Sequence, residues 1–85
     1  MSINVVATII ANPGSEDAVR RAMQGIVAPT RAEEGNVSYD LFEAADAPGT
    51  FITVEQWDAA ADLETHLQTD HIQSALATLG TELAA

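Results

Sequence analysis

The sequence predicts one small α+β domain, spanning residues 1–85, in which helices cover an antiparallel sheet. Three short runs have the two-residue alternation, or the two-sided apolar character, of strands. The segments between and after them carry apolar residues every third or fourth position, which is the spacing of amphipathic helices. Turns rich in Pro and Gly separate several of these segments. The resulting order, β-α-β-β-α, is that of a βαββαβ domain without its last strand.

Residues 3–11 form the first expected strand. Its apolar side chains lie on both faces, which indicates that both faces are covered. An Asn-Pro-Gly turn follows, and Ser15 is expected to cap the first helix with its side-chain oxygen. Pro29 lacks the backbone N–H that a helix interior requires, so we expect this helix to kink or to stop near Ala28.

Residues 37–43 and 51–57 form the next two expected strands, joined by a Pro-Gly loop of hairpin length. In the earlier strand, Val37, Tyr39 and Leu41 are expected to share one face. The later strand is again apolar on both faces.

Two helices are expected in the remainder of the chain. Residues 59–67 form a short one, and Thr69 or Asp70 can cap the second. The apolar face of this last helix is formed by Ile72, Leu76, Leu79 and Leu83, with Gly80 inside the helix.

The pattern of the strands predicts a homodimer. In a βαββαβ domain the first and third strands lie centrally, and helices cover one face of the sheet. Here those two strands are apolar on both faces, so a second copy packing sheet to sheet is the expected cover. A domain of this size also buries only about 60–65% of its unfolded surface, so oligomerisation would add stability.

The charge of the chain excludes two classes of partner. Its net charge of −10 comes from 13 acidic residues against three arginines, and no basic stripe is present. Such a chain repels nucleic-acid backbones and anionic membranes. It contains no cysteine, so disulfides and thiolate metal sites are excluded. With no leader, apolar spanning segment or lipidation signal, a soluble cytoplasmic protein is expected.

Glu55, Trp57, His66 and His71 are the main candidate site residues, and the chain has no other tryptophan or histidine. Glu55 and Trp57 lie two apart on an expected strand, so they project from the same face. The histidines lie in the helical stretch that follows. We therefore expect a carboxylate, an indole and two imidazoles to surround one pocket between sheet and helix.

The two histidines suit proton transfer better than metal binding. On one continuous helix, side chains five residues apart point about 140° apart. His66 and His71 therefore converge only if the helix breaks near Thr69 and Asp70. The sequence suggests no third ligand, so no metal site is expected. Imidazole titrates near pH ~6.5, so one of these histidines can remove a phenolic proton.

Three strand residues have both a functional and a purely structural interpretation. A buried Glu55 requires a partner, and it can either orient an imidazole or pair with Arg31. Trp57 can form a flat wall for an aromatic substrate, or it can simply fill the core. Tyr39 can donate its hydroxyl to a bound oxygen, or it is a half-buried aromatic residue of its strand.

Several motifs occur in a characteristic order: an opening strand ending in Asn12-Pro13-Gly14, then Thr30-Arg31-Ala32-Glu33-Glu34-Gly35, Tyr39-Asp40-Leu41, Phe51, Val54-Glu55-Gln56-Trp57, His66 and Asp70-His71. Through this ordered set, which covers nearly the whole chain, the sequence resembles the antibiotic biosynthesis monooxygenase family. The resemblance implies a dimeric α+β barrel of ferredoxin-like protomers with a ligand cavity between sheet and helices. It also implies a ligand contact for Asn4, which matches a polar residue of the first strand in some relatives.

The resemblance implies one leading function and two alternatives. The leading hypothesis is a cofactor-independent monooxygenase that oxidises a quinol or polycyclic phenol with O₂. His71, His66 and Glu55 would manage protons, while Trp57 and Tyr39 would hold the ring. The alternatives are a non-catalytic module that binds aromatic ligands or serves in stress responses, and an isomerase acting on a small phosphorylated signalling molecule.

Two departures from relatives bear on these expectations. Haem-degrading relatives need a histidine further along the last helix, where residues 73–78 read Gln-Ser-Ala-Leu-Ala-Thr, so haem degradation is disfavoured. Relatives also continue into a fourth strand, whereas this sequence stops at Ala85. Without that strand, the first strand would be an exposed edge with apolar side chains on both faces, which natural proteins usually avoid. Either the chain is shortened, or a partner covers that edge in a different way.

Overall fold

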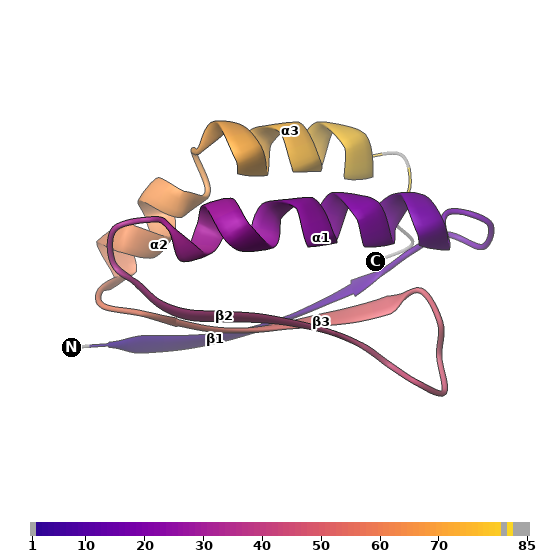
Figure 1. The fold of residues 1–85 in the computed structure, drawn as a ribbon, viewed down its shortest axis with the longest axis horizontal. Coiled ribbons are helices and arrows are strands. Elements are labelled where there is room, and N and C mark those ends of the chain that lie inside the picture. The colour runs from indigo at the N-terminus through magenta and orange to yellow at the C-terminus, as the bar shows by residue number, and fades with distance from the viewer. Residues whose placement is uncertain (1, 81, 83–85) are drawn as a thin grey trace.

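The computed structural model describes residues 2–80 and 82. Within them, a three-stranded antiparallel sheet carries all the helices on one face (Figure 1). The elements in chain order are β1 (Ile3–Ile10), α1 (Glu16–Arg31), β2 (Asn36–Glu43), β3 (Thr50–Trp57), α2 (Ala60–His66) and α3 (Asp70–Leu79). The predicted α+β, ferredoxin-like class is confirmed, and Leu83 lies outside the described residues.

The sheet has the order β1-β3-β2, so β3 is the central strand. Its residue Glu55 lies opposite Val5 of β1 on one side and opposite Tyr39 of β2 on the other. Among the described strands β1 is an edge of the sheet, as expected. The central position of β3 holds Glu55 between hydrogen-bonded neighbours and fixes the direction of its side chain.

A stop of the first helix near Ala28, one of the two expectations for Pro29, was wrong. α1 continues through Pro29 to Arg31, and Ala32 N–H still donates to the carbonyl of Ala28 at 3.2 Å. Pro29 lies in the last turn, where its missing N–H removes one hydrogen bond without ending the helix. Ser15 is the N-cap residue as expected, but its hydroxyl donates to the carboxylate of Glu82 rather than accepting a hydrogen bond from the helix.

The expected face of Val37 was wrong as well. The pairing of β2 with β3 shifts between Asn36 and Ser38, which inserts one extra residue as a β-bulge. Val37 is therefore exposed, whereas Tyr39 is buried beneath the helices and Leu41 is partly buried against the core. At the other end of the chain, the Thr69 hydroxyl accepts from the N–H of Ile72 and caps α3 as predicted, and Gly80 follows the helix.

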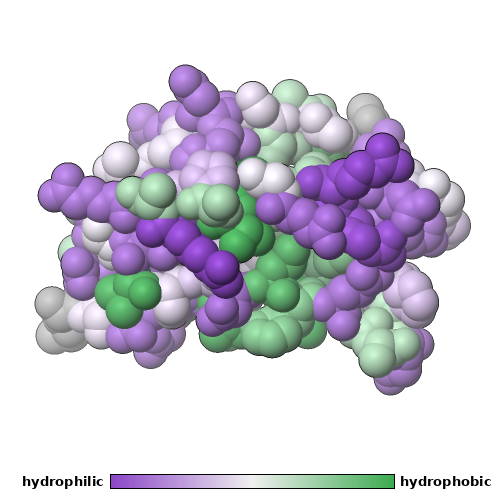
Figure 2. Space-filling view, in the orientation of Figure 1, coloured by the Kyte–Doolittle hydropathy of each residue, from purple (hydrophilic) through white to green (hydrophobic). Residues whose placement is uncertain are grey.

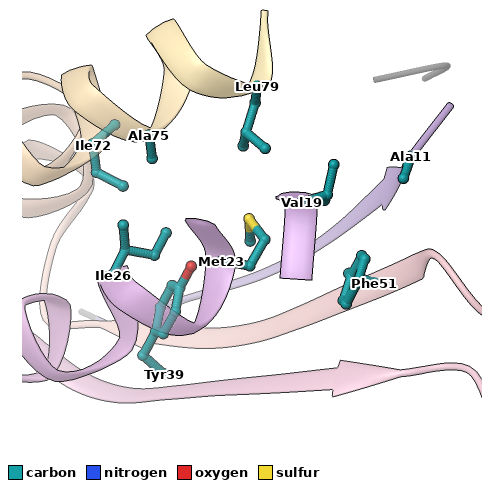
Figure 3. Close-up of a cluster of buried hydrophobic side chains, with 9 residues drawn as sticks. All are labelled: Ala11, Val19, Met23, Ile26, Tyr39, Phe51, Ile72, Ala75 and Leu79. Atoms are coloured by element: carbon teal, nitrogen blue, oxygen red, sulfur yellow. The ribbon is translucent and has the colours of Figure 1, made fainter. Parts of the chain in front are cut away.

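The core lies between the sheet and the helices, where side chains from α1, α3 and the strands point toward one another (Figure 3). Each large apolar side chain buried there contributes about 1.5–3 kcal/mol. Figure 2 shows hydrophobic side chains gathered between the helix layer and the sheet, with hydrophilic ones on either side. The buried cluster comprises Ala11, Val19, Met23, Ile26, Tyr39, Phe51, Ile72, Ala75 and Leu79.

The opposite face of the sheet has no helix over it among the described elements. Its apolar side chains are well exposed: Val6 by 69%, Phe42 by 54%, Val54 by 42% and Ile10 by 38%. This observation confirms that the strands are apolar on both faces. No helix in the described part of the chain is both long enough and apolar enough to cross a membrane.

Candidate functional site

A break between two helices brings His66 and His71 together. α2 ends at His66, and α3 begins at Asp70 with Thr69 as its cap. The two imidazole rings lie 6.0 Å apart between centroids. The convergence that required a break near Thr69 and Asp70 is therefore present.

Glu33 joins the two histidines. Its Oε2 lies 2.5 Å from His66 Nδ1 and 2.8 Å from His71 Nε2. An ionised carboxylate only accepts hydrogen bonds, so both of these nitrogens carry hydrogen. Nε2 of His66 and Nδ1 of His71 are then free to accept a proton when the rings are neutral.

The backbone holds Glu33 in place within the turn that follows α1. Its N–H donates to the carbonyl of Thr30 at 3.0 Å, and its own carbonyl accepts from Asn36 at 3.2 Å. Gly35 closes the turn with a φ of +87°, a conformation suited to glycine. The sequence showed Glu33 only as part of a family motif, and nothing in it separated Glu33 from its exposed neighbour Glu34.

Glu55 forms a second polar group on the helix-facing side of β3. Thr53 Oγ1 donates to Glu55 Oε2 at 2.8 Å, and Trp57 Nε1 donates to Glu55 Oε1 at 3.0 Å. These three buried residues alternate along one strand, as the two-residue period predicted. A buried carboxylate requires such partners, and here each oxygen has one.

The partners of Glu55 differ from those expected. No histidine bonds to it; Glu33 orients the imidazoles instead. Arg31 does not pair with it either, because its guanidinium donates to the Tyr39 carbonyl at 2.9 Å and to Asp40 at 3.1 Å. The sequence therefore predicted that Glu55 is hydrogen-bonded, but not by which groups.

Trp57 connects the two polar groups through its ring. The indole is fully buried, and its centroid lies 4.7 Å from that of His66. Tyr39 lies on the other strand beside β3, with its ring 6.1 Å from His66. The structure thus places Trp57, Tyr39 and His71 around the ring of His66, with Glu55 bonded to Trp57.

Asn4 is the exception among the predicted site residues. It lies on the exposed face of β1, paired in register with Gln56. The other predicted residues lie on the helix side of the sheet or in the helices, so the structure does not bring Asn4 to them.

A cavity of about 260 Å³ lies between the sheet and the helices. Its polar lining comes from Tyr39, Thr53 and Glu55. The Tyr39 hydroxyl, which points from β2 toward α1 (Figure 3), makes no hydrogen bond to any described residue. The apolar lining is formed by Ala7, Ile9, Met23, Ile26, Leu67, Ile72, Ala75, Leu76 and Leu79.

The surroundings of Tyr39 keep it protonated. Burial, followed by the negative charges of Glu55 and Glu33, raises its pKa to about 12. At neutral pH it is therefore a hydrogen-bond donor facing the cavity. The expectation that an indole and two imidazoles share this pocket with the carboxylate was wrong. Of the expected residues Glu55 and Tyr39 line the cavity, whereas Trp57, His66 and His71 do not.

A separate groove of about 300 Å³ runs between α1 and α3 at the surface. His71 lines it, while Ile26 and Ala75 line both the groove and the inner cavity and so separate them. None of the described residues that line the groove is acidic: the others are Arg21, Ala22, Gly25, Ser74 and Thr78. The Glu33 cluster can therefore be reached from solvent through His71.

The same cluster also provides ligands for a metal ion. One atom each from Glu33, His66 and His71 can be chosen so that all lie within 4.8 Å of one another. The sequence suggested two of these groups and missed the third. Glu33 lies 33 positions from His66 and 38 positions from His71 in the sequence, and no local pattern encodes contacts over such separations.

The fold and its sequence have clear relatives. YcnE of Bacillus subtilis (strain 168), which is named as a monooxygenase, is 38% identical over 77 residues, covering 91% of this chain and 80% of YcnE. YgiN of Escherichia coli (strain K12), named as a quinol monooxygenase, is 33% identical over 82 residues, covering 85% of this chain and 79% of YgiN.

A solved structure gives the same result. PA3566 from Pseudomonas aeruginosa superposes with a TM-score of 0.93 at 35% identity, covering 96% of this chain and 83% of PA3566. The family model described as antibiotic biosynthesis monooxygenase matches residues 2–78. This chain therefore belongs to the antibiotic biosynthesis monooxygenase family.

Proposed function

We propose that this protein is a monooxygenase that oxidises a quinol or another electron-rich phenol with O₂ in the cavity beneath α1 and α3. The observation that carries the proposal is the pair of polar groups on the sheet wall of that cavity. Tyr39 offers a hydroxyl donor and Glu55 a carboxylate acceptor, while most other lining side chains are apolar. A phenolic ring fits such a space, because its edge is apolar and its oxygen both donates and accepts.

In the proposed reaction, Glu55 accepts the phenolic proton and Tyr39 donates a hydrogen bond to the oxygen as it becomes negative. The phenolate then passes one electron to O₂, which gives a substrate radical and superoxide. These combine at a ring carbon, and the resulting peroxide anion takes back the proton held by Glu55 to form a hydroperoxide. Loss of water leaves a carbonyl, so one oxygen atom ends in the product and the other, with the two hydrogens from the phenolic O–H and ring C–H, in water.

The roles of the remaining predicted residues follow from their contacts. Trp57 holds one oxygen of Glu55 and packs against His66, so it positions both. His66 and His71, joined by Glu33, are proposed to exchange protons between the site and solvent through the groove that His71 lines. No bound cofactor is proposed, and the same turnover with and without a chelator tests that part.

Oxygen uptake with a panel of quinols tests the proposal. We expect Glu55→Gln to lower turnover by about 10²–10⁴ and Tyr39→Phe by about 10². Trp57→Ala and His71→Ala are expected to lower turnover through the positioning and proton-exchange roles. Glu34→Gln, which removes the same charge from an exposed position, is the matched control and retains activity. Unchanged turnover in both Glu55→Gln and Tyr39→Phe would overturn the assignment.

The exposed face of the sheet supports the proposal of a homodimer. Val6, Ile10, Phe42 and Val54 form an apolar surface on this face, and a second copy packing sheet to sheet covers such a surface. Light scattering on the protein as it elutes from a size-exclusion column is expected to give twice the mass of one chain. A monomer mass at micromolar concentration would contradict this proposal.

An isomerase acting on a small phosphorylated molecule is a second candidate, favoured by one observation. Arg21 on α1 makes no ion pair with any described residue, and it lines the acid-free groove together with Ser74, Thr78 and His71. A guanidinium and two hydroxyls beside an imidazole suit a phosphate group. NMR of a phosphorylated sugar-like substrate incubated with the protein would reveal isomerisation, and loss of that activity in Arg21→Gln would locate it.

A further inference from the structure

Three segments that are distant in the sequence bring potential metal ligands to one point. Glu33 comes from the turn after α1, His66 from the last residue of α2, and His71 from the first turn of α3. Their side chains are exposed by 12%, 4% and 22%, respectively. We propose that Glu33, His66 and His71 form a binding site for a first-row divalent ion of the zinc type.

The donor set suits this class of ion. Two imidazoles and one carboxylate are ligands that Zn²⁺ and its neighbours accept readily, and they leave at least one coordination position for water. The donors would be His66 Nδ1, His71 Nε2 and a carboxylate oxygen of Glu33, because these are the atoms that already face one another. Hard ions such as Mg²⁺ and Ca²⁺ prefer sites composed of oxygen, so they fit less well.

The two distances to Glu33 require only a small rearrangement. In the described state the two nitrogens lie 2.5 and 2.8 Å from Glu33 Oε2, as hydrogen bonds. Ligands about 2.0–2.2 Å from a tetrahedral zinc ion lie roughly 3.3 Å from each other. The contacts must therefore open by roughly 0.5–0.8 Å while the ion replaces the two hydrogens. Glu33 lies in a turn rather than in a helix or strand, so its side chain can adjust without disturbing the core.

The groove between α1 and α3 supplies access for the ion. His71 is the most exposed of the three groups, and it lines this groove. The Thr69 hydroxyl lies 3.2 Å from His71 Nε2, where it can accept a hydrogen bond from a water on the ion. A metal site needs such an entry path and polar neighbours in addition to its ligands.

The metal proposal does not depend on the proposed oxygenase function. An ion held by these atoms would occupy the nitrogens through which the imidazoles contact Glu33. If the oxygenase proposal holds, Zn²⁺ then slows turnover by blocking proton exchange. If it does not hold, binding of the ion is unaffected.

Titration of the full chain, freed of metal with a chelator, with ZnCl₂ tests the proposal by calorimetry. We expect one ion per chain with a dissociation constant in the micromolar range or below, and at least a 100-fold loss of affinity in Glu33→Gln. His71→Asn, at the most exposed ligand, serves as a second variant whose folding is least at risk, and it is expected to show the same loss. Glu34→Gln removes one charge from the adjacent exposed position and is expected to bind as the parent does.

Two further readouts distinguish the site from loose binding to an acidic surface. Co²⁺ held by two imidazoles and a carboxylate is expected to give a visible absorption band in the parent and in Glu34→Gln, but not in Glu33→Gln. Zn²⁺ is expected to raise the melting temperature of the same two proteins and not that of His71→Asn. Equal affinity in Glu33→Gln and Glu34→Gln, or the lack of a saturable one-to-one step in the parent, would overturn the proposal.

Discussion

The stability of this protein at alkaline pH is expected to depend on one side chain, Tyr39. The chain has one tyrosine and no cysteine, and its three basic residues are all arginines. Tyr39 is therefore the side chain that titrates between about pH 9 and pH 12. Burial and the charges of Glu55 and Glu33 raise its pKa in the folded protein from 10.0 to about 12. The folded state thus keeps a proton that the unfolded chain releases near pH 10.

The size of this effect follows from the difference between the two pKa values. About two pH units at about 1.36 kcal/mol per unit correspond to roughly 3 kcal/mol. Because the folded pKa is the higher one, this stability is fully present below pH 10 and is lost as the pH rises to about 12. For a domain whose total stability is about 5–15 kcal/mol, the loss is large.

Two measurements on the same samples check this prediction. The ultraviolet absorbance of tyrosinate reports ionisation of Tyr39 directly, and urea unfolding at each pH gives the free energy of unfolding. Tyr39→Phe is the control, and its free energy of unfolding is expected to stay nearly constant over this pH range. Glu55→Gln removes one of the charges that raise the pKa, so Tyr39 is expected to ionise at lower pH there. Ionisation near pH 10 in the folded parent, or the same alkaline slope in Tyr39→Phe, would refute the reasoning.

Two other substitutions test local features of the fold. Gly35→Ala is expected to cost about 1–2 kcal/mol in urea unfolding, because φ is +87° there and an added Cβ would collide with the Asp62 carboxylate. Gly25→Ala, inside α1 with open space around it, is the matched control and is expected to stabilise by about 0.5–1 kcal/mol; equal effects at both glycines would contradict this. Hydrogen bonding to Arg20 lowers the pKa of Glu43 to about 2, from 4.5. The free energy of unfolding of the parent is therefore expected to fall relative to that of Glu43→Gln as the pH falls from about 4.5 to about 2. A constant difference between the two proteins over this pH range would argue against it.

Local patterns were sufficient for the strand half of the site. The two-residue period places Thr53, Glu55 and Trp57 on one face of β3, and only the direction of a strand is needed to predict it. The cap at Thr69 is equally local, and it determines where α3 begins. From these features the sequence could predict that Glu55 and Trp57 lie together, and that His66 and His71 can converge.

The role of Glu33 could not be predicted in this way. Which side chain of the turn points inward depends on the residue at which α1 ends, because each helical residue adds about 100° of rotation. The sequence left a kink or a stop near Ala28 open, whereas α1 continues to Arg31. That difference of three residues rotates the exit of the chain by roughly 300°. The contacts of Glu33 with His66 and His71 also span distances in sequence that no periodicity covers.

The bulge in β2 was not predictable for a related reason. A β-bulge adds one residue to a strand but leaves no characteristic residue pattern in this sequence. The alternation of Val37, Tyr39 and Leu41 therefore predicts a regular strand. Its position is set by the pairing with β3, where both Asn36 and Ser38 must find partners. The exposed position of Val37 follows from that pairing rather than from its own hydrophobicity.

The contact between Trp57 and His66 has an optical consequence. Trp57 is the one tryptophan of the chain, and its indole packs 4.7 Å from the His66 ring. A protonated imidazole quenches indole fluorescence by accepting an electron from the excited ring, whereas neutral imidazole quenches weakly. The intrinsic emission of the folded protein thus reports the charge of His66 without any added label.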